Sequence, residues 1–459
     1  MSTNDVTKAR NRIEALVDAG SFTEIGALVK ARSTDFALQE TAKPGDGVIT
    51  GYGTVGGKLV YLYSQDAAVL GGAVGEMHAK KIARLYNMAV QMGAPVIGLL
   101  DSAGLRLQES TDALEGFGAL YKAQAEASGV VPEIMAVFGK CGGGMAVLAG
   151  LADFVYLEEK GAALFVNAPN TLDGNYTEKL DTASAAYVSE HTGLADAYGT
   201  EEEIFGEIRA LLSVLPSNNA ELAAEDATDD LNRLTPELAG ITDARYIASV
   251  ISDGGLFVET KKDFAKDAVT GFIRLDGVTV GLVGNGEERL SADGCEKIAS
   301  FVNFCDAFDI PLLTLVNVKG FEAALPSEAR LAIAASRLAF AFANAGVPKI
   351  SVILGDAFGS AYIGMNSKAL GADIVYMLPD ARIGLMDEGP AAKILAKEGD
   401  DLAEIRAAFA AKQSAEAAAS RGIADRLITM ETLRRDVLQA LEMLFNKRAD
   451  LPEKKHGTK

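Results

Sequence analysis

Cysteine, histidine and tryptophan are almost absent from this sequence, which has three cysteines, three histidines and no tryptophan among 459 residues. Cys141, Cys295 and Cys305 form an odd and scattered set, which indicates a reducing compartment rather than a disulfide framework. No cysteine and histidine pair has the spacing of a zinc site, so we expect no metal. A nucleophilic Cys141 is an alternative to a small buried thiol, but the chemistry is expected to depend little on histidine bases.

Basic charge and long apolar runs are also scarce. The sequence has 43 basic and 63 acidic residues, for a net charge of −20. This charge argues against nucleic acid as the main partner but leaves room for a local basic pocket. No uncharged apolar stretch reaches the roughly 18 residues of a membrane span. The first residues, "MSTNDVTKARNRIEALVDAG", lack the apolar centre of a signal peptide, and we expect a cytoplasmic protein. The length predicts two or three domains.

The chain repeats itself at a nearly constant offset. "KKIARLYNMAVQMGAPVIGLLDSAG" (80–104) and "EKIASFVNFCDAFDIPLLTLVNVKG" (296–320) share a helical segment, a turn with proline, a β-rich run and a glycine, 216 residues apart. The same offset relates 131–144 to 347–360, and hairpin-like segments further upstream repeat at an offset of 220. This duplication predicts two similar domains, 1–228 and 229–459, connected through the polar, acidic region 216–240. Buried β-runs that alternate with helical segments predict an α/β fold with both sheet faces covered.

Two glycine-rich clusters stand at equivalent places, after a buried strand and before a predicted helix. They are "GKCGGGMA" (139–146) and "GDAFGSAY" (355–362). The first N–H groups of a helix lack internal partners, and glycine lets a ligand oxygen approach them. Neither cluster continues as a P-loop, so a developing oxyanion is a better ligand than phosphate. Close packing explains one cluster, but the duplicated placement favours two oxyanion holes.

A further glycine pattern is set aside. "GYGTVG" (51–56) fits the dinucleotide pattern G-x-G-x-x-G, but the strand-like "GKLVYLYS" follows where that motif requires a helix. We therefore predict a hairpin turn here.

Several longer motifs carry a resemblance to a known family. They include "PGDGVITGYG", "GGAVGEMHAKKI", "GAPVIGLLDSAGLRLQES", "LPSNN", "FVNFCDAFDIPLLTLV" and "MNSKALGAD", spread nearly end to end. The sequence resembles the carboxyltransferase subunits of biotin-dependent acyl-CoA carboxylases and decarboxylases, of the propionyl-CoA carboxylase β and methylmalonyl-CoA decarboxylase α type. The resemblance implies an α/β fold of two duplicated crotonase-like (ClpP/crotonase) β-β-α superhelix domains, with acyl-CoA on 1–228 and biotin on 229–459.

The activity that the resemblance implies is transfer of a carboxyl group between carrier-bound biotin and the α-carbon of a short acyl-CoA. The acyl pair is acetyl/malonyl or propionyl/methylmalonyl, the direction is open, and the reaction passes through an enolate. Gly143 and Gly144 match the amides that hold the thioester oxygen, and Ser360 and Ala361 match the pair that faces the biotin ureido oxygen. No metal is implied. The expected substrate-binding residues are Ser102, Gly104, Arg106, Gly142, Gly359, Tyr362 and Ile363.

The resemblance also implies partners. Because the sequence has no biotin-attachment motif, biotin is expected on a separate carboxyl carrier protein. Biotin carboxylase or membrane decarboxylase subunits are the other expected partners, and the latter would hold the protein peripherally at a membrane. A homodimer that assembles further into a hexamer is expected, with active sites formed where opposite halves of two subunits meet.

The biotin half departs from the family pattern. Gly359-Ser360-Ala361 stands where two glycines usually precede the alanine, and Lys319 stands where a proline is usual. Segment 284–295 is shorter than in the family, and 319–338 lacks the expected glycine- and isoleucine-rich stretch, which could change the carrier or the activity. Two alternatives therefore stay open: a crotonase-type hydratase or hydrolase that uses Glu109 as its acid, and a non-catalytic scaffold subunit.

Overall fold

The protein is described from a computed structural model that covers residues 7–32, 36, 42–227 and 229–449. Contacts between Cα atoms divide the chain into two compact units, Met1–Glu221 (unit 1) and Leu222–Lys459 (unit 2). The predicted domain boundary at 228/229 stays a prediction, and residue 228 itself lies outside the described residues. Each unit contains one eight-stranded sheet.

In unit 1 the strand order is β1-β2-β3-β4-β5-β6-β8, and β7 pairs with the end of β5. The pairs β1/β2 and β2/β3 are antiparallel and the others are parallel. The bounds are α1 (Lys8–Leu16), β1 (Thr23–Ile25), β2 (Val48–Val55), β3 (Lys58–Gln65), α3 (Glu76–Met92), β4 (Val96–Ser102), α4 (Ser110–Ala127), β5 (Glu133–Gly142), α5 (Gly144–Gly150), β6 (Phe154–Glu158), β7 (Ala163–Phe165), α6 (Ala185–His191), β8 (Ala197–Gly199) and α7 (Glu201–Val214).

Unit 2 repeats this topology, with the order β9-β10-β11-β13-β15-β16-β18 and with β17 paired to the end of β15. The bounds are α8 (Ala244–Ile251), β9 (Phe257–Thr260), β10 (Ala268–Leu275), β11 (Val278–Asn285), β12 (Arg289–Leu290), α9 (Ala292–Ala307), β13 (Leu312–Val318), β14 (Gly320–Phe321), α10 (Leu325–Asn344), β15 (Lys349–Phe358), α11 (Gly359–Gly364), β16 (Ile374–Met377), β17 (Arg382–Gly384), α12 (Glu388–Leu395), α13 (Leu402–Ala411), α14 (Ala415–Ser420), β18 (Arg426–Leu427) and α15 (Leu433–Leu444). The predicted duplication is thus confirmed at the level of strand order.

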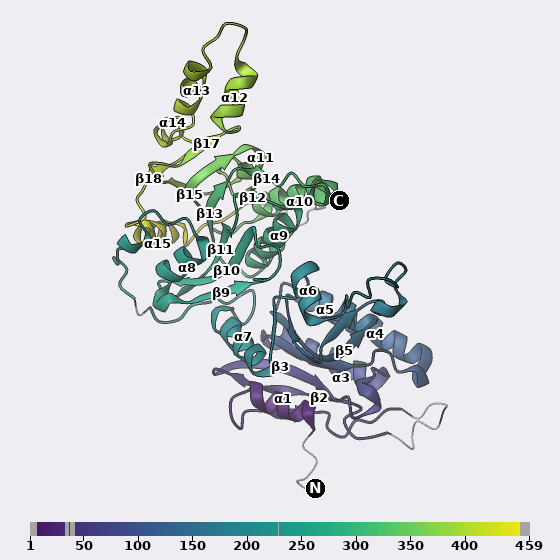
Figure 1. The fold of residues 1–459 in the computed structure, drawn as a ribbon. Coiled ribbons are helices and arrows are strands. Elements are labelled where there is room, and N and C mark those ends of the chain that lie inside the picture. The colour runs from purple at the N-terminus through teal and green to yellow at the C-terminus, as the bar shows by residue number, and fades with distance from the viewer. Residues whose placement is uncertain (1–6, 33–35, 37–41, 228, 450–459) are drawn as a thin grey trace. The chain divides into compact units, whose positions relative to one another are not determined.

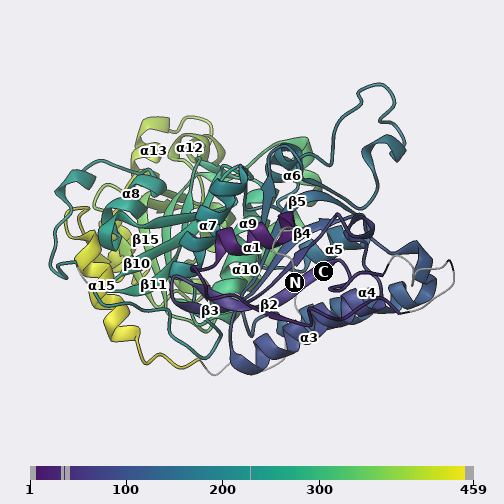
Figure 2. The same ribbon diagram turned by 90° about the horizontal axis from the view of Figure 1, so that it is seen from below.

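Helices cover both faces of each sheet. In unit 1, α3 packs on β2 and β3 with α4 beside it (Figure 2), whereas α1 and α7 contact strands from the other side. In unit 2, α9 and α10 pair in the same way, and α8 and α15 take the opposite face (Figure 1). Central strands such as β4 and β13 are buried along nearly their whole length, as strands covered on both faces must be.

The hairpin predicted for "GYGTVG" is confirmed. β2 and β3 are joined by Gly56 and Gly57, both with positive φ, which is the backbone conformation that glycine adopts without strain. The Asp18 carboxylate accepts hydrogen bonds from both N–H groups, at 3.0 and 2.9 Å. These bonds hold the pKa of Asp18 below its usual value. A hairpin here leaves no helix N-terminus for a dinucleotide.

The two units differ in two loops. Between β7 and α6, unit 1 has only one short 3-10 turn, whereas unit 2 inserts α12 and α13 between β17 and α14. These two helices form a hairpin that projects from unit 2 (Figure 1). The second difference lies in the segment after the second strand of the hairpin, which is β3 in unit 1 and β11 in unit 2. Residues 66–73 follow β3, whereas only the four residues 286–289 take their place after β11.

Candidate functional site

The first glycine cluster lies where β5 gives way to α5. Gly143 joins them with φ 61° and ψ −122°, a conformation that side chains other than glycine rarely adopt. Its N–H donates to the Phe165 carbonyl at 2.8 Å and extends the β5/β7 ladder by one bond. The next two N–H groups, of Gly144 and Met145, have no acceptor among the described residues. These two N–H groups are available to a ligand oxygen.

Close packing explains why glycines flank this turn. A Cβ on Gly142 would approach the Phe165 ring to 2.7 Å, and a Cβ on Gly144 would lie 2.8 Å from the Tyr121 hydroxyl. Tyr121 also donates to the Gly144 carbonyl at 2.8 Å, which fixes the start of α5 against α4. A Cβ on Gly143 would meet nothing within 4 Å, so only the backbone conformation requires glycine there.

The second cluster has the same design in unit 2. Gly359 has φ 62° at the junction of β15 and α11, and the N–H groups of Ser360 and Ala361 lack acceptors among the described residues. Ser360 is exposed and Ala361 is buried. Tyr362 is largely buried, which raises its pKa to about 12, whereas Ile363 is 48% exposed on α11. Each predicted pair therefore lies on one turn, at the carboxyl end of a central strand.

The predicted "DSAGLR" residues fall into two groups. Ser102 donates through Oγ to the Gly72 carbonyl at 2.7 Å and accepts from the Gly104 N–H at 3.2 Å, which ties the loop to its neighbour. Gly104 has φ 96°, and a Cβ there would lie 3.5 Å from the Gly142 carbonyl oxygen. The loop that follows β4 thus lies directly against the first glycine cluster.

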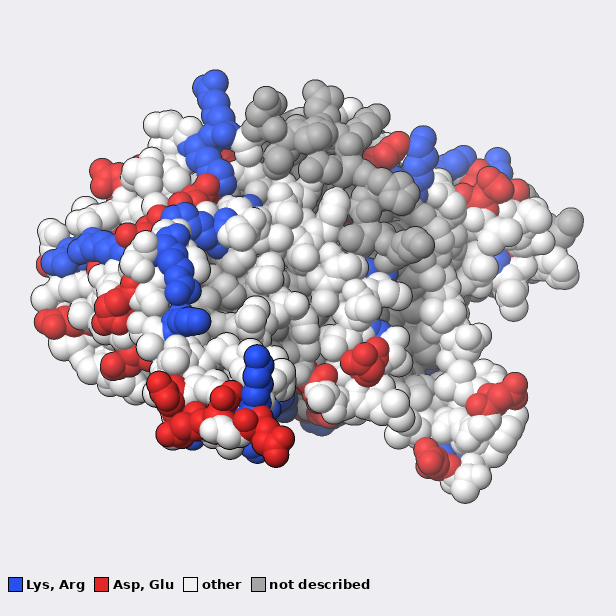
Figure 3. Space-filling model, turned by 90° about the horizontal axis from the view of Figure 1, so that it is seen from above, with Lys and Arg blue, Asp and Glu red and all other residues white. Residues whose placement is uncertain are grey.

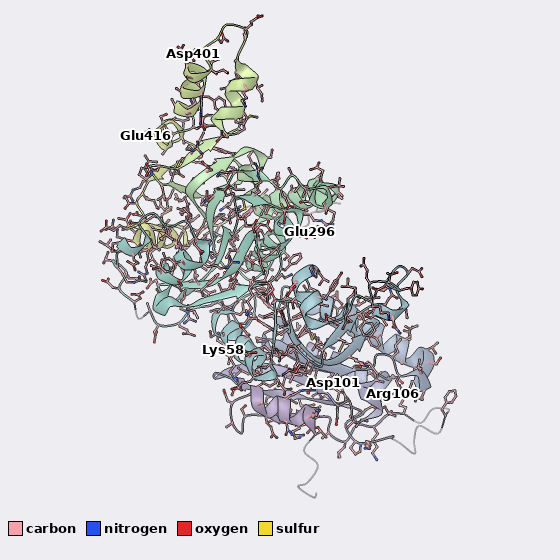
Figure 4. The ribbon with its side chains drawn as sticks, in the orientation of Figure 1. Lys58, Asp101, Arg106, Glu296, Asp401 and Glu416 are labelled. Carbon is pink, nitrogen blue, oxygen red and sulfur yellow. The ribbon has the colours of Figure 1, made fainter. Side chains whose placement is uncertain are left out.

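Arg106 is fully buried. Its guanidinium donates to Asp46 Oδ1 at 2.6 Å, to Glu109 Oε1 at 2.8 Å and to the Ala73 carbonyl at 2.8 Å. Burial raises the pKa of Asp46, and the Arg106 charge partly offsets this. A contact between this guanidinium and a substrate would first require these bonds to break. The geometry therefore favours a positioning role for Arg106, whose place in unit 1 is labelled in Figure 4.

Glu109, the acid of the hydratase alternative, is occupied as well. Its Oε1 is held by Arg106, and its Oε2 accepts from the Glu76 N–H at 2.6 Å. A carboxylate with both oxygens engaged and 5% of its surface exposed is poorly placed to move protons on a substrate.

The nucleophilic alternative for Cys141 is also disfavoured. Cys141 is fully buried, and burial raises the pKa of its thiol to about 12, so the thiolate is scarce at neutral pH. His78 is fully buried between Gln65 and the Asp46 carbonyl, and burial lowers its pKa to about 3. Among the described residues, no group of three or more His, Cys, Asp or Glu side chains is placed to hold a metal ion. Of the described helices, none combines the length and apolar character needed to cross a bilayer.

Two of the departures noted in the biotin half, Lys319 and the shortened segment before α9, contact each other. The N–H of Lys319 donates to the Glu288 carbonyl at 2.7 Å, and its ammonium lies 2.5 Å from Glu288 Oε1 and 4.0 Å from Asp356 Oδ2. Asp356 also pairs with Arg382 at 2.7 Å. Because Lys319 and the short segment 286–289 contact each other, these two sequence departures form one structural change at the carboxyl end of β13.

Met145 is a candidate that sequence reasoning missed. The offset of 216 aligns Gly359, Ser360 and Ala361 with Gly143, Gly144 and Met145. Because Ser360 and Ala361 are the second pair, the equivalent first pair is Gly144 and Met145. The offset of the duplication could therefore have identified Met145. The pair that it gives is shifted by one residue from Gly143 and Gly144, the pair that the resemblance implies.

Comparisons with known proteins agree on one family. Residues 5–458 match the family described as the carboxyl transferase domain. The propionyl-CoA carboxylase beta chain of Roseobacter denitrificans is 38% identical over 98% of this chain and 92% of its own. The methylmalonyl-CoA decarboxylase subunit alpha of Propionigenium modestum is 37% identical, with the same coverage.

Solved structures give the same result. Transcarboxylase 12S, crystallised with methylmalonyl-coenzyme A and methylmalonic acid bound, superposes with a TM-score of 0.93 at 34% identity, over 98% of this chain and 92% of its own. In that structure transcarboxylase 12S forms a hexamer assembly. The predicted α/β fold of two crotonase-like domains is confirmed by this match.

Proposed function

The chain belongs to the carboxyl transferase domain family, and from this premise we propose that it moves a carboxyl group between carrier-borne biotin and the α-carbon of a short acyl-CoA. The observation that carries the proposal is the duplicated turn, in which two N–H groups of each unit have no acceptor among the described residues. Two such turns suit a reaction in which two carbonyl oxygens, one on each reactant, gain negative charge. A hydratase or hydrolase requires only one.

On the acyl-CoA side, the N–H groups of Gly144 and Met145 hold the thioester oxygen as its enolate forms. A fixed N–H donor of this kind contributes about 2.7–4 kcal/mol to lowering a barrier. Gly143 shapes the turn, and its own N–H donates a hydrogen bond to the Phe165 carbonyl. Ser102, Gly104 and Gly142 keep the adjoining loop in place, and Arg106 with Glu109 anchors the far end of that loop.

On the biotin side, Ser360 and Ala361 would hold the ureido oxygen. Bound biotin would supply or accept the carboxyl group. The residues present fit this group, because Gly359 keeps the approach to the two N–H groups free of a side chain and Ser360 is exposed. Gly359, Tyr362 and Ile363 form the rest of the turn and the start of α11.

The proposed acyl pair is propionyl-CoA and methylmalonyl-CoA, in either direction. It is supported by the names of the relatives and by the methylmalonyl-coenzyme A bound to transcarboxylase 12S. We further propose a separate biotin carrier protein, biotin carboxylase or membrane decarboxylase subunits as partners, and a homodimer within a hexamer. A cytoplasmic location, peripheral to a membrane through partners, completes the proposal.

Exchange of a radiolabelled carboxyl group tests the proposed function. Wild-type protein is incubated with free biotin and carboxyl-labelled malonyl-, methylmalonyl- or glutaconyl-CoA, and the products are separated. We expect label on biotin, fastest from methylmalonyl- or malonyl-CoA, because the exposed apolar side chain of Ile363 offers no partner to a distant second carboxylate. A hydratase or hydrolase would convert CoA esters without labelling biotin, and a scaffold would do neither.

A further inference from the structure

A chain of ion pairs lies at the carboxyl end of β15 in unit 2, and the proposed mechanism does not use it. Asp356 Oδ1 accepts hydrogen bonds from Nε and Nη2 of Arg382 at 2.8 and 2.7 Å, and Asp356 Oδ2 lies 4.0 Å from the Lys319 ammonium. Arg382 Nη1 donates to Glu388 Oε2 at 2.8 Å, and Arg406 donates to Glu388 Oε1 at 2.9 Å. Five side chains of alternating charge are thus linked.

Three of these side chains join the segments that surround the second glycine turn, 359–361. Lys319 follows β13, Asp356 lies three residues before the turn at the end of β15, and Arg382 begins β17, which pairs with that end of β15. The Arg382 guanidinium also lies 5.2 Å from the centre of the Phe358 ring, directly beside the turn. β14, which comes after Lys319, lies against α11, the helix that begins with the turn. The pairs of Asp356 therefore hold together the three segments next to the turn.

The same chain reaches the two helices that are inserted in unit 2. Glu388 lies on α12 and Arg406 lies on α13, in the hairpin that projects from this unit (Figure 1). Gln413, which follows α13, donates to the carbonyl of Met386, which precedes α12, at 2.6 Å. The base of the hairpin is therefore bonded to itself and, through Arg382, to the strand that leads into the turn.

Unit 1 shows that the fold does not require these charges. At the offset of 216, Asp356 corresponds to Lys140, and the register of β7 places Ala163 opposite Lys140. Ala103 stands at the position of Lys319. Because alanine carries no charge, neither neighbour of Lys140 can form the pairs that Asp356 makes. The chain of ion pairs is therefore a feature of the unit that is expected to hold biotin.

The exposure of the central pair indicates what it can contribute. The side chains of Arg382 and Asp356 are 33% and 13% exposed. Ion pairs near the surface add little to the free energy of unfolding, but a guanidinium that engages a carboxylate through two N–H groups fixes the geometry between them. Acidic and basic side chains also intermingle on the face of the molecule in Figure 3, as expected of charges that act in pairs. Such a pair holds a segment in place more than it stabilises the fold.

We propose that Asp356 and Arg382 are positioning residues for the biotin side: their ion pair holds the second turn so that the N–H groups of Ser360 and Ala361 meet the ureido oxygen. A hydrogen-bond donor stabilises a developing charge only when it is fixed at the place where that charge forms. The inference rests on the proposed function, which puts biotin at this turn. Loss of the pair should impair the reaction with biotin and leave the binding of acyl-CoA, assigned to unit 1, unchanged.

Kinetics of carboxyl exchange between methylmalonyl-CoA and free biotin separate the two substrates. Asp356→Asn and Arg382→Met should each lower kcat/KM for biotin about tenfold or more, as expected for displacing a fixed donor, while KM for methylmalonyl-CoA stays within twofold. Arg382→Lys keeps the charge but loses the two-pronged contact, so its kcat/KM for biotin should fall between those of wild type and Arg382→Met.

Arg245→Met is the matched control. Arg245 pairs with Glu259 in the same unit at 2.8 Å, and these side chains are 36% and 16% exposed, close to the values of the Arg382–Asp356 pair. This variant loses a comparable ion pair on α8 and β9, so kcat/KM for biotin should stay within twofold. Thermal unfolding of each variant checks that all of them fold.

Hydrogen exchange of the unliganded protein adds a readout that needs no turnover. Asp356→Asn and Arg382→Met should speed exchange of the N–H groups that pair 356–358 with 382–384, and leave the equivalent pairs of 140–142 with 163–165 unchanged. Unchanged exchange at 356–358, an unchanged kcat/KM for biotin, or an equal loss in Arg245→Met would each overturn the inference. If wild type transfers no label while both variants speed exchange at 356–358, the result counts against biotin as the ligand and not against the hold of the pair on the turn.

Discussion

Gly143 and Gly359 have nearly the same φ, 61° and 62°, although they are 216 residues apart. At both positions the backbone turns so that the following two N–H groups point away from the strand ladder. A side chain with a branched Cβ is strained at such φ values, by about 1–3 kcal/mol. The turn, rather than the N–H of Gly143 itself, is what glycine contributes.

Gly143→Val tests this role. The valine Cβ would meet open space, so the fold should survive, but the strained turn should displace the Gly144 and Met145 donors. Carboxyl transfer should fall about 10²-fold or more, as expected for losing one fixed donor. Steady-state kinetics measure the loss, with circular dichroism as the folding check.

Gly57→Val is the matched control, since Gly57 also has a positive φ and open space around its Cβ. It should cost similar strain in the β2–β3 turn and leave turnover within twofold. Wild-type turnover in folded Gly143→Val protein would remove this turn from the mechanism.

Glu133 is a buried carboxyl group that the mechanism does not use. It begins β5 with no exposed surface, and among the described residues neither oxygen has a hydrogen-bond partner within 3.5 Å, although the Gln124 amide and the Tyr86 hydroxyl lie near enough to offset part of the effect of burial on its pKa. Burial, with added repulsion from Asp153, raises its pKa to about 9. A folded-state pKa above the unfolded value means that the unfolded chain loses its proton first, so wild-type stability falls as the pH rises from about 4.5 to about 9.

Glu133→Gln should remove this pH dependence. The variant should melt at a higher temperature than wild type at pH 8, and the difference should shrink toward pH 3.5, where Glu133 is mostly neutral in both states. Scanning calorimetry at the two pH values measures it. An equal difference at both values would show that Glu133 is ionised in the folded protein or equally protonated in both states.

At the scale of elements, the same buried lysine fixes one helix of each unit to the segment before its hairpin. Lys297 on α9 donates to the carbonyls of Lys261, Phe264 and Ala268 at 2.8–2.9 Å. Lys81 on α3 donates to the carbonyls of Gly45 and Val48. In both units the buried ammonium is satisfied by backbone carbonyls, which is why a charged residue is tolerated inside the fold.

Lys81→Met should therefore destabilise unit 1 by about 2–4 kcal/mol, because buried carbonyls lose their donor. Lys80→Met is the matched control one residue away. Within the described part of the chain its exposed ammonium pairs only with Glu76, an ion pair worth less than about 1 kcal/mol. Urea denaturation of both variants measures the difference. Equal effects would mean that the Lys81 bonds contribute nothing beyond a surface ion pair.

The elements were predictable from the sequence where pattern and repeat agreed. Buried runs such as 96–100, the helix after "GGAVGE" and the hairpin at Gly56 all follow from local periodicity and turn chemistry. The pairing of Gly142 with Phe165 could not be foreseen, because it depends on the β5/β7 register. In unit 2 the register pairs Phe358 with Gly384. The phenylalanine of this pair is therefore on the long strand β15 in unit 2, whereas in unit 1 it is on the short strand β7.

Side-chain roles were harder to predict than backbone positions. The turns at 143 and 359 could be located from glycine and from the repeat, but the bond from Gly143 to Phe165 shifts the free donors to Gly144 and Met145. Arg106 lies in the motif, yet its burial beside Asp46 depends on a residue 60 positions away. Contacts of this range leave no local signature in the sequence.

At the scale of the whole molecule, the duplication gives each unit one donor turn, whereas the reaction needs both. The expected homodimer would combine the first turn of one subunit with the second turn of its partner, and a twofold contact would form two such sites. Gly143→Val and Ala361→Pro each damage one turn. In a mixed dimer of the two variants, one site would contain both altered turns and the other would contain two unaltered turns. Co-expression should therefore recover one intact site of two. An active monomer, or no recovery in purified mixed dimers, would contradict shared sites.

Transfer of label from carboxyl-labelled methylmalonyl-CoA to free biotin, compared among wild type, Gly143→Val and Ala361→Pro, tests the central claim most directly. Wild type should place one labelled carboxyl on biotin for each propionyl-CoA formed. Both folded variants should lose transfer about 10²-fold or more, because each lacks one set of donors. Release of propionyl-CoA without labelled biotin, or full transfer by either folded variant, would contradict a carboxyltransferase that works through two N–H turns.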